Sequence, residues 1–461
     1  MSSHLPTAAV IGAGCSGITA VKGLVERGFE VTCFDASDRI GGNWVYENKN
    51  GMSACYRDLH INTSRLKMAY SDFAMPEDYP DYPRHDQIAA YFDSYVDHFG
   101  LRGRIRFETK VEQAARLDDG VWELTLAGGE RHRFDALVVA NGHHWNPRMP
   151  EPTFPGSDTF QGEQLHAHAY MNPDALEGKK VVVLGMGNSA MDIAVEASYV
   201  TDEVYLAARR GAYIVPKYIF GKPTDQLGGW MASPRIPFTI RRKIVAKLID
   251  SYVGDVESFG LPKPDHEFGQ AHPTVSGRIL DRITHGAVRP KPNIRELDGR
   301  EVVFADGTRV EADVVIYCTG YQITFPFFDE DFLAAPDNQI ELFRRVFHPE
   351  IPNLFFVGLL QPLGSVMPLS EVQGGWIASY LEGRYALPPR TQLLRDIAAD
   401  QAAMRSRYVA SKRHTIQVDF DDYLFELSRE RKRGAARAQA RGFALPVAPR
   451  AQAVDREALA A

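Results

Sequence analysis

Two glycine clusters are the residues of this chain whose types and spacing point most directly to chemistry. The first reads Gly12-Ala-Gly-Cys-Ser-Gly17, and the second reads Gly185-Met-Gly-Asn-Ser-Ala190. In such a cluster the first glycine permits a tight turn, the second lets a pyrophosphate approach the backbone, and the last small residue lets a helix pack on a strand. The helix N-terminus then stabilises the phosphate charge. The pattern predicts two dinucleotide sites, formed by Gly12, Gly14, Ser16 and Gly17 and by Gly185, Gly187 and Ala190.

The residues that follow each cluster predict opposite ribose chemistry. Asp35 stands 18 residues after Gly17, where a carboxylate accepts hydrogen bonds from a free ribose 2′-hydroxyl. After the second cluster that place is taken by Arg209 and Arg210, and guanidinium groups suit a 2′-phosphate. The alternative for the two arginines is a pair of solvated surface side chains. We expect FAD at the first site and NADPH at the second, because two such sites in one chain indicate electron transfer between two nucleotides.

The elements that must position these residues are repeated in the chain. Each cluster follows an apolar strand and precedes a helical stretch and a second strand, at 30–34 and 203–208 respectively. Further apolar strands run into Gly142, Gly320 and Gly358. The sequence therefore predicts an α/β fold of two nested Rossmann-like dinucleotide-binding domains with parallel sheets. The predicted FAD domain comprises residues 1–160 and 316–430, the NADPH domain comprises 161–315 with an insertion at about 221–290, and 431–461 form a flexible Ala/Arg-rich tail.

Composition excludes several other classes of protein. The 461 residues carry a net charge of −7, so no global basic field would attract nucleic acid. The four cysteines form no C-x-x-C pair, which argues against a zinc site and a redox dithiol, and we predict no metal. No apolar run reaches the roughly 18 residues of a membrane span. A reducing cytoplasm is the expected location.

A signature between the two clusters resembles a known family. Phe160-Gln-Gly-Glu-Gln-Leu-His-Ala-His-Ala-Tyr170 is similar to the F-x-G-x-x-x-H-x-x-x-Y motif of class B flavin-containing monooxygenases, and ordered matches cover nearly the whole chain. They include 35–44, 61–64, 142–144, 185–196, 318–321, 361–364 and 371–376. The resemblance implies that NADPH reduces FAD, that O₂ adds to the flavin to give a C4a-hydroperoxide, and that one oxygen atom passes to an amine or sulfide, as in an N,N-dimethylaniline-type enzyme.

The same resemblance assigns individual residues. It makes Asn62 the catalytic residue, because an amide offers a donor and an acceptor without adding charge. It places the cofactor FAD against Arg39, Gly42, Asn43, Trp44 and Thr63, with Val111 at the adenine and Gln373 near the flavin ring. NADPH should lie along Asn188, Ser189, Ala190, Met191 and Asp192. His166, His143 and His144 are given structural or linker roles.

Three alternatives to nitrogen or sulfur oxygenation stay open. Baeyer–Villiger oxidation of a ketone needs a cation at the flavin, for which Arg57 and Arg65 are candidates by sequence nearness only. Tyr170 closes the signature where many Baeyer–Villiger enzymes carry Trp, which favours the nitrogen and sulfur branch. A plain NADPH oxidase and a non-catalytic flavoprotein are the other two. A homodimer is a possibility taken from the family.

Overall fold

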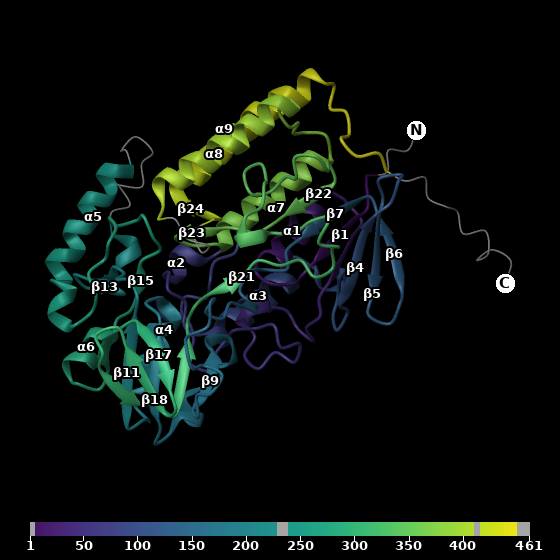
Figure 1. The fold of residues 1–461 in the computed structure, drawn as a ribbon. Coiled ribbons are helices and arrows are strands. Elements are labelled where there is room, and N and C mark those ends of the chain that lie inside the picture. Colours follow the sequence, from purple (N-terminus) through teal and green to yellow (C-terminus); the bar gives the residue numbers. More distant parts are fainter. Residues whose placement is uncertain (1–4, 228–237, 410–414, 450–461) are drawn as a thin grey trace.

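Two five-stranded parallel sheets form the centre of this computed structural model, which describes residues 5–227, 238–409 and 415–449 (Figure 1). The first sheet has the spatial order β22 (Leu354–Phe356), β7 (Ala136–Val139), β1 (Ala8–Ile11), β2 (Val31–Phe34) and β3 (Ile105–Arg106). The second has the order β16 (Arg289–Pro292), β11 (Glu203–Ala208), β10 (Lys180–Leu184), β20 (Val314–Tyr317) and β9 (Glu163–His166). All five strands of the second sheet come after β7 and before β22 in the sequence, so the second unit is inserted into the first. The predicted nested α/β fold is therefore confirmed.

The central strands are apolar along their whole length because both faces of each sheet are covered. All four residues of β1, β7 and β20 are buried. On the first sheet, helices α1 (Gly17–Val25) and α7 (Met367–Leu381) approach closely at two glycines. A Cβ at Gly374 would lie 2.7 Å from the carbonyl oxygen of Thr19, and one at Gly23 would lie 2.9 Å from the backbone of Gly374. This contact holds α1, which begins at the first glycine cluster, against the C-terminal part of the chain.

Smaller antiparallel sheets and connections complete the two units. Residues 111–134 form a three-stranded sheet of β4 (Val111–Arg116), β5 (Trp122–Leu126) and β6 (Arg131–Phe134). A second one is formed by β17 (Ile294–Asp298), β18 (Glu301–Phe304) and β19 (Arg309–Glu311). The two connections between the units pair with each other as β8 (Asn146–Pro147) and β21 (Tyr321–Gln322). The two chain segments that connect the units are therefore paired with each other.

The segment between β11 and β16, called the insertion from here on, contains the insertion predicted at about 221–290 and begins some residues earlier. Between β11 and β16 lie β12 (Ile214–Val215), β13 (Tyr218–Ile219), β14 (Lys222–Pro223), β15 (Thr274–Val275), α5 (Phe238–Val253) and α6 (Ile279–Thr284). Residues 228–237 of this predicted insertion lie outside the described residues. The remaining helices are α2 (Arg65–Met68), α3 (His85–His98), α4 (Asn188–Ala197), α8 (Arg390–Arg407) and α9 (Phe420–Ala440). None of the helices in the described ranges combines the length and apolar character needed to cross a bilayer.

The structure corrects one prediction at the C-terminal end. Residues 431–440, predicted to be part of a flexible tail, form the second half of α9 (yellow in Figure 1). Its buried residues are Tyr423, Leu427, Glu430, Gly434 and Ala438, which recur at helical spacing. The ring of Tyr385 occupies the place of the missing side chain at Gly434, where a Cβ would lie 1.9 Å from it. The end of the predicted tail, 450–461, lies outside the described residues.

Candidate functional site

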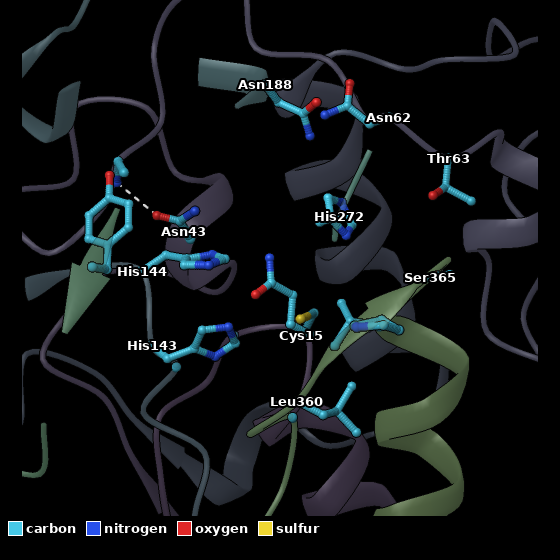
Figure 2. A pocket seen from close by; sticks show the side chains of 18 of the residues that line it. Cys15, Asn43, Asn62, Thr63, His143, His144, Asn188, His272, Leu360 and Ser365 are labelled. Carbon is cyan, nitrogen blue, oxygen red and sulfur yellow. Dashed lines mark hydrogen bonds between the residues drawn. The ribbon is translucent and has the colours of Figure 1, made fainter. Parts of the chain in front are cut away.

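A cavity of about 990 Å³ opens at the carboxyl ends of strands from both sheets. Residues of both glycine clusters line it, together with the chain after β7, the chain after β20 and the insertion. Figure 2 shows side chains from these segments reaching into it. Parallel sheets bind ligands at this end of their strands. A shared cavity is what two cofactors that exchange electrons require.

The first glycine turn is shaped by two close backbone contacts. Gly12 has φ +104°, and a Cβ there would lie 2.5 Å from the carbonyl oxygen of Ala140. At Gly17 a Cβ would lie 1.7 Å from the oxygen of Gly12, so the helix packs against the turn as predicted. Gly14 differs, because its Cβ would meet only Gly42 at 3.6 Å and the residue faces the cavity. The turn is therefore bare of side chains where a phosphate would approach.

Asp35 lies at the end of β2 and lines the same cavity. Its carboxylate accepts hydrogen bonds from the backbone N–H groups of Ala13 and of Ser37, the latter at 2.7 Å. Burial raises the pKa of Asp35, and these two hydrogen bonds oppose the shift. The acid is thus fixed against the turn, where an acceptor for ribose hydroxyls was predicted.

The second glycine turn leads into α4. Gly185 has φ +145°, and a Cβ there would lie 2.9 Å from the oxygen of Cys318. Gly187 precedes the helix, and it lines the cavity together with Asn188, Ser189 and Ala190. The Asn188 side chain accepts a hydrogen bond from the N–H of Val275 at 2.8 Å. Strand β15 of the insertion therefore helps to position this turn.

Arg209 and Arg210 follow β11 directly, are exposed, and do not line the cavity. The Arg210 guanidinium donates two hydrogen bonds to Asp265, at 2.6 and 3.0 Å. Arg209 makes no ion pair with any described residue. Recognition of a 2′-phosphate by this pair stays a prediction, and it requires at least one side chain to turn toward the ligand.

Asn62 lines the cavity, and its side-chain amide has no hydrogen-bond partner within the described part of the chain. Figure 2 shows Asn62 and Asn188 both reaching into the cavity, although they come from different units. Asn43 lines it too, and its side-chain oxygen accepts a hydrogen bond from the N–H of Ala54 at 2.7 Å. The predicted residues that reach the cavity are Gly12, Gly14, Ser16, Asp35, Gly42, Asn43, Trp44, Asn62, Thr63, Val111, Gly187, Asn188, Ser189 and Ala190.

Four other predicted contact residues lie elsewhere. Gln373 is fully buried in α7, where it accepts the N–H of Gly358 at 2.9 Å and donates to the Tyr423 hydroxyl at 2.7 Å. Asp192 accepts the hydroxyl hydrogen of Tyr56, and Met191 is fully buried in the apolar core. Arg39 is exposed and paired with Asp38 at 2.8 Å. Gln373, Asp192 and Arg39 already have polar partners within the protein, and none of the four residues lines the cavity.

The cavity is also lined by histidines for which only structural or linker roles were predicted. Both ring nitrogens of His143 are buried and have no hydrogen-bond partner within the described residues. Burial holds the pKa of His143 well below its usual range, with a smaller contribution from His144, whose ring centre is 4.3 Å away. Burial also lowers the pKa of His166 to about 4. The motif Gly142-His-His144 gave a signal only through its glycine, and the orientation of the rings could not be read from it.

Comparison with known proteins decides the family. A family model described as FMO-like, flavin-binding monooxygenase-like, matches residues 6–433. The chain belongs to this family. Human flavin-containing monooxygenase 5 is 37% identical over 436 residues, which cover 91% of this chain and 81% of the relative. Dimethylaniline monooxygenase (N-oxide-forming) 2 of Rattus norvegicus is 33% identical over 438 residues, covering 92% and 82%.

Solved structures of similar fold agree with this assignment. S-allyl-L-cysteine S-oxygenase from Allium sativum has a TM-score of 0.70 and 25% identity, with 94% of this chain and 92% of that chain covered. A structure that is a complex with FAD and NADP also has a TM-score of 0.70, at 19% identity. The flavin-containing monooxygenase fold therefore spans almost the whole described chain.

Membership of the family makes the chain a flavin-dependent monooxygenase with the cofactors FAD and NADP(H), as predicted. The residues present fit these groups. The first turn has no side chain at Gly14, and the buried carboxylate of Asp35 lies beside it, so Gly14, Ser16 and Asp35 would hold the FAD diphosphate and ribose. Gly187 and Ser189, at the N-terminus of α4, would hold the NADP(H) diphosphate.

Proposed function

We propose that this flavin-containing monooxygenase transfers one atom of O₂ to a nucleophilic nitrogen or sulfur of a small molecule, with NADPH as reductant. The observation that carries the proposal is the position of Asn62. Its uncharged amide lines a cavity shared by both nucleotide turns and makes no hydrogen bond to the described protein. An amide without a protein partner is available to bind a ligand as donor and acceptor.

The chain's own residues would hold the reacting groups and limit proton supply. Reduced flavin, when bound, supplies the electrons that activate O₂. Asn62 orients the reacting groups that lie between the two turns. The side chain of Asn188 is held at the second turn by its hydrogen bond from the N–H of Val275. His143 is neutral at physiological pH because burial depresses its pKa, so it supplies no ready proton. Exclusion of water and protons prevents loss of the activated oxygen as peroxide.

Nitrogen or sulfur as the acceptor is supported by the relatives. The garlic protein is named an S-oxygenase, and the rat relative is named for N-oxide formation. Tyr170 closes the signature motif, as the nitrogen and sulfur branch leads us to expect, and its hydroxyl donates to Glu196 at 2.7 Å. The substrate would be a soft, uncharged nucleophile, since the reacting oxygen is electrophilic.

Baeyer–Villiger oxidation is a second candidate because a cation lies in the cavity. Neither cation predicted from sequence lies there: Arg57 is paired with Asp174 at 2.7 Å, and Arg65 donates to the oxygen of Pro76. Lys217 of the insertion does line the cavity, and its ammonium group donates to the backbone oxygen of Ile61 at 3.4 Å, directly before Asn62. Burial lowers the pKa of Lys217.

The two candidates are separated by offering one thioether and one ketone together with NADPH and air. Sulfoxide as the main product supports the proposal, whereas ester without sulfoxide would reverse it. Asn62→Ala and Asn62→Asp should keep FAD and NADPH oxidation but divert most reducing equivalents to H₂O₂. Full coupling in both variants would remove Asn62 from the reaction, and peroxide alone from the unaltered protein would favour an NADPH oxidase.

A cytoplasmic location and a homodimer stay predictions. Size-exclusion chromatography with light scattering would test the second.

A further inference from the structure

The loop that carries Asn62 is held from the opposite unit. Although this loop follows the first glycine unit, the backbone N–H of Ser64 donates to the Asp225 carboxylate at 2.7 Å. The amide nitrogen of Gln226 donates to the Ser64 hydroxyl oxygen at 3.0 Å. Ser64 is fully buried, whereas Asp225 is exposed, so only the Ser64 side of these contacts is shielded from water. Two residues after Asn62, the chain is thus fixed by a turn of the insertion.

The residue before Asn62 is fixed by the same part of the insertion. The Lys217 ammonium group donates to the oxygen of Ile61 at 3.4 Å and lies 4.8 Å from the ring centre of Tyr82. The Lys217 carbonyl accepts from the Tyr82 hydroxyl at 2.7 Å and from the N–H of Thr224 at 2.9 Å. Lys217 and the turn 224–226 are therefore one connected body, which contacts the Asn62 loop on both sides.

Contacts within the first unit support the loop less directly. The N–H of Ile61 donates to the oxygen of Pro83 at 3.1 Å, and the Ser64 carbonyl accepts from the N–H groups of Lys67 and Met68 in α2, each at 2.9 Å. They anchor the flanks of the loop, while the Asn62 amide itself has no partner among the described residues. The position of that amide thus depends on where the insertion lies.

We propose that Asp225 is a positioning residue for Asn62, so that the reacting amide is correctly placed only when the NADPH-binding unit holds the arrangement seen here. The inference rests on the proposed role of Asn62. A carboxylate accepting a backbone N–H is a charge-assisted hydrogen bond, which is short and directional. Small displacements of a reacting group have large effects on rate. Asp225 also lines the cavity, and the role proposed for it is exerted through this hydrogen bond to the Asn62 loop.

The test compares three variants of the FAD-loaded full chain. Asp225→Ala removes the acceptor, and Asp225→Asn keeps an oxygen that can accept from Ser64. Asp174→Ala is the matched control, because Asp174 forms another carboxylate contact between the units, with Arg57 at 2.7 and 2.9 Å, away from Asn62. The readouts are H₂O₂ formed per NADPH oxidised with a thioether present, FAD content, Tm, and the Kd for NADP⁺.

We expect Asp225→Ala to raise the fraction of NADPH lost as H₂O₂ roughly fivefold, with FAD content, Tm and Kd for NADP⁺ close to those of the unaltered protein. The fraction of NADPH lost as H₂O₂ by Asp225→Asn should lie between those of Asp225→Ala and the unaltered protein. Asp174→Ala should lose no more NADPH as H₂O₂ than the unaltered protein does. If Asp225→Ala is fully coupled while Asn62→Ala is not, this proposal fails and the proposed function stands. If Asn62→Ala is itself fully coupled, Asn62 has no part in the reaction and this proposal fails with it, whereas the proposed function is decided separately by the sulfoxide and ester products. Equal uncoupling in Asp225→Ala and Asp174→Ala would overturn a specific role for Asp225.

Discussion

The two glycine turns share a pattern but differ in how their selective residues are placed. At the first turn Asp35 faces inward and its carboxylate is fixed by the N–H groups of Ala13 and Ser37. At the second turn Arg209 and Arg210 face outward, and Arg210 is paired with Asp265. A carboxylate is short and must lie against the turn to reach a ribose. Arginine side chains are long and can close on a phosphate from outside.

This difference indicates that the polar groups of the first site are more fully preorganised for nucleotide binding than those of the second site. The first site already holds its polar groups in place, so binding a dinucleotide there costs little further ordering. At the second site Arg210 must exchange an exposed ion pair for a phosphate. The first site therefore suits a cofactor that stays bound, and the second suits one that binds and leaves in each cycle.

The largest expected effect comes from filling the first turn. Gly14→Ala should keep the fold, because its Cβ would meet only Gly42 at 3.6 Å, but should abolish FAD binding by blocking the approach of the diphosphate. Flavin absorbance per protein chain and far-UV circular dichroism measure the two properties. Gly12→Ala is the contrasting variant, and it should lose the fold as well, since its Cβ would lie 2.5 Å from the oxygen of Ala140. A Gly14→Ala protein with full FAD content would contradict the assignment of the first turn.

A smaller effect is expected at the second turn. Arg209→Ala combined with Arg210→Ala should raise the KM for NADPH about tenfold, the value of one charge-assisted hydrogen bond, and leave the KM for NADH unchanged. Steady-state kinetics with both nucleotides measure this. Asp265→Ala frees Arg210 and should lower the KM for NADPH or leave it unchanged. An unaltered ratio of the two KM values in the double variant would place the 2′-phosphate elsewhere.

A third difference concerns the helices that follow the turns, and it affects stability rather than cofactor binding. Helix α4 carries Glu196, whose pKa burial raises to about 7, whereas the buried cation Lys22 of α1 is paired with Glu26 at 3.0 Å. Because the folded protein binds a proton at Glu196 that the unfolded chain releases near its ordinary pKa of about 4.3, this contribution to stability is present at low pH and is lost as pH rises through about 7. Glu196→Gln should therefore stabilise the protein at pH 8 by roughly 1–3 kcal/mol. Tm measured from pH 5 to 8 would show it, and equal slopes for both proteins would contradict it.

Local steric requirements explain why much of the site could be predicted. The turns at Gly12 and Gly185 need glycine because of contacts made within a few residues of sequence or with the neighbouring strand, so spacing alone identifies them. The hydrogen bonds of Gln373 could not be predicted, because the direction of its amide depends on Gly358 and Tyr423, which no local pattern reveals. The second half of α9 was missed because charged residues and Gly434 conceal its periodicity.

Contacts between the units were beyond prediction for the same reason. The hydrogen bond from Ser64 to Asp225 joins residues 161 positions apart, and Lys217 reaches Ile61 across 156. Composition and periodicity carry no information about such pairs. Arg57 and Arg65 were candidate cations only because they lie near Asn62 in sequence, whereas Lys217, far from it in sequence, is the one that lines the cavity beside Asn62.

The central claim is that both turns bind their cofactors at one cavity, where one atom of O₂ enters the product and the other leaves as water. The most direct test is turnover of a thioether with NADPH under ¹⁸O₂, followed by mass spectrometry of the product and measurement of NADPH consumed. We predict one ¹⁸O atom in each sulfoxide and one NADPH oxidised per sulfoxide formed. Unlabelled sulfoxide, or NADPH oxidation that yields only H₂O₂ under all conditions, would contradict the account.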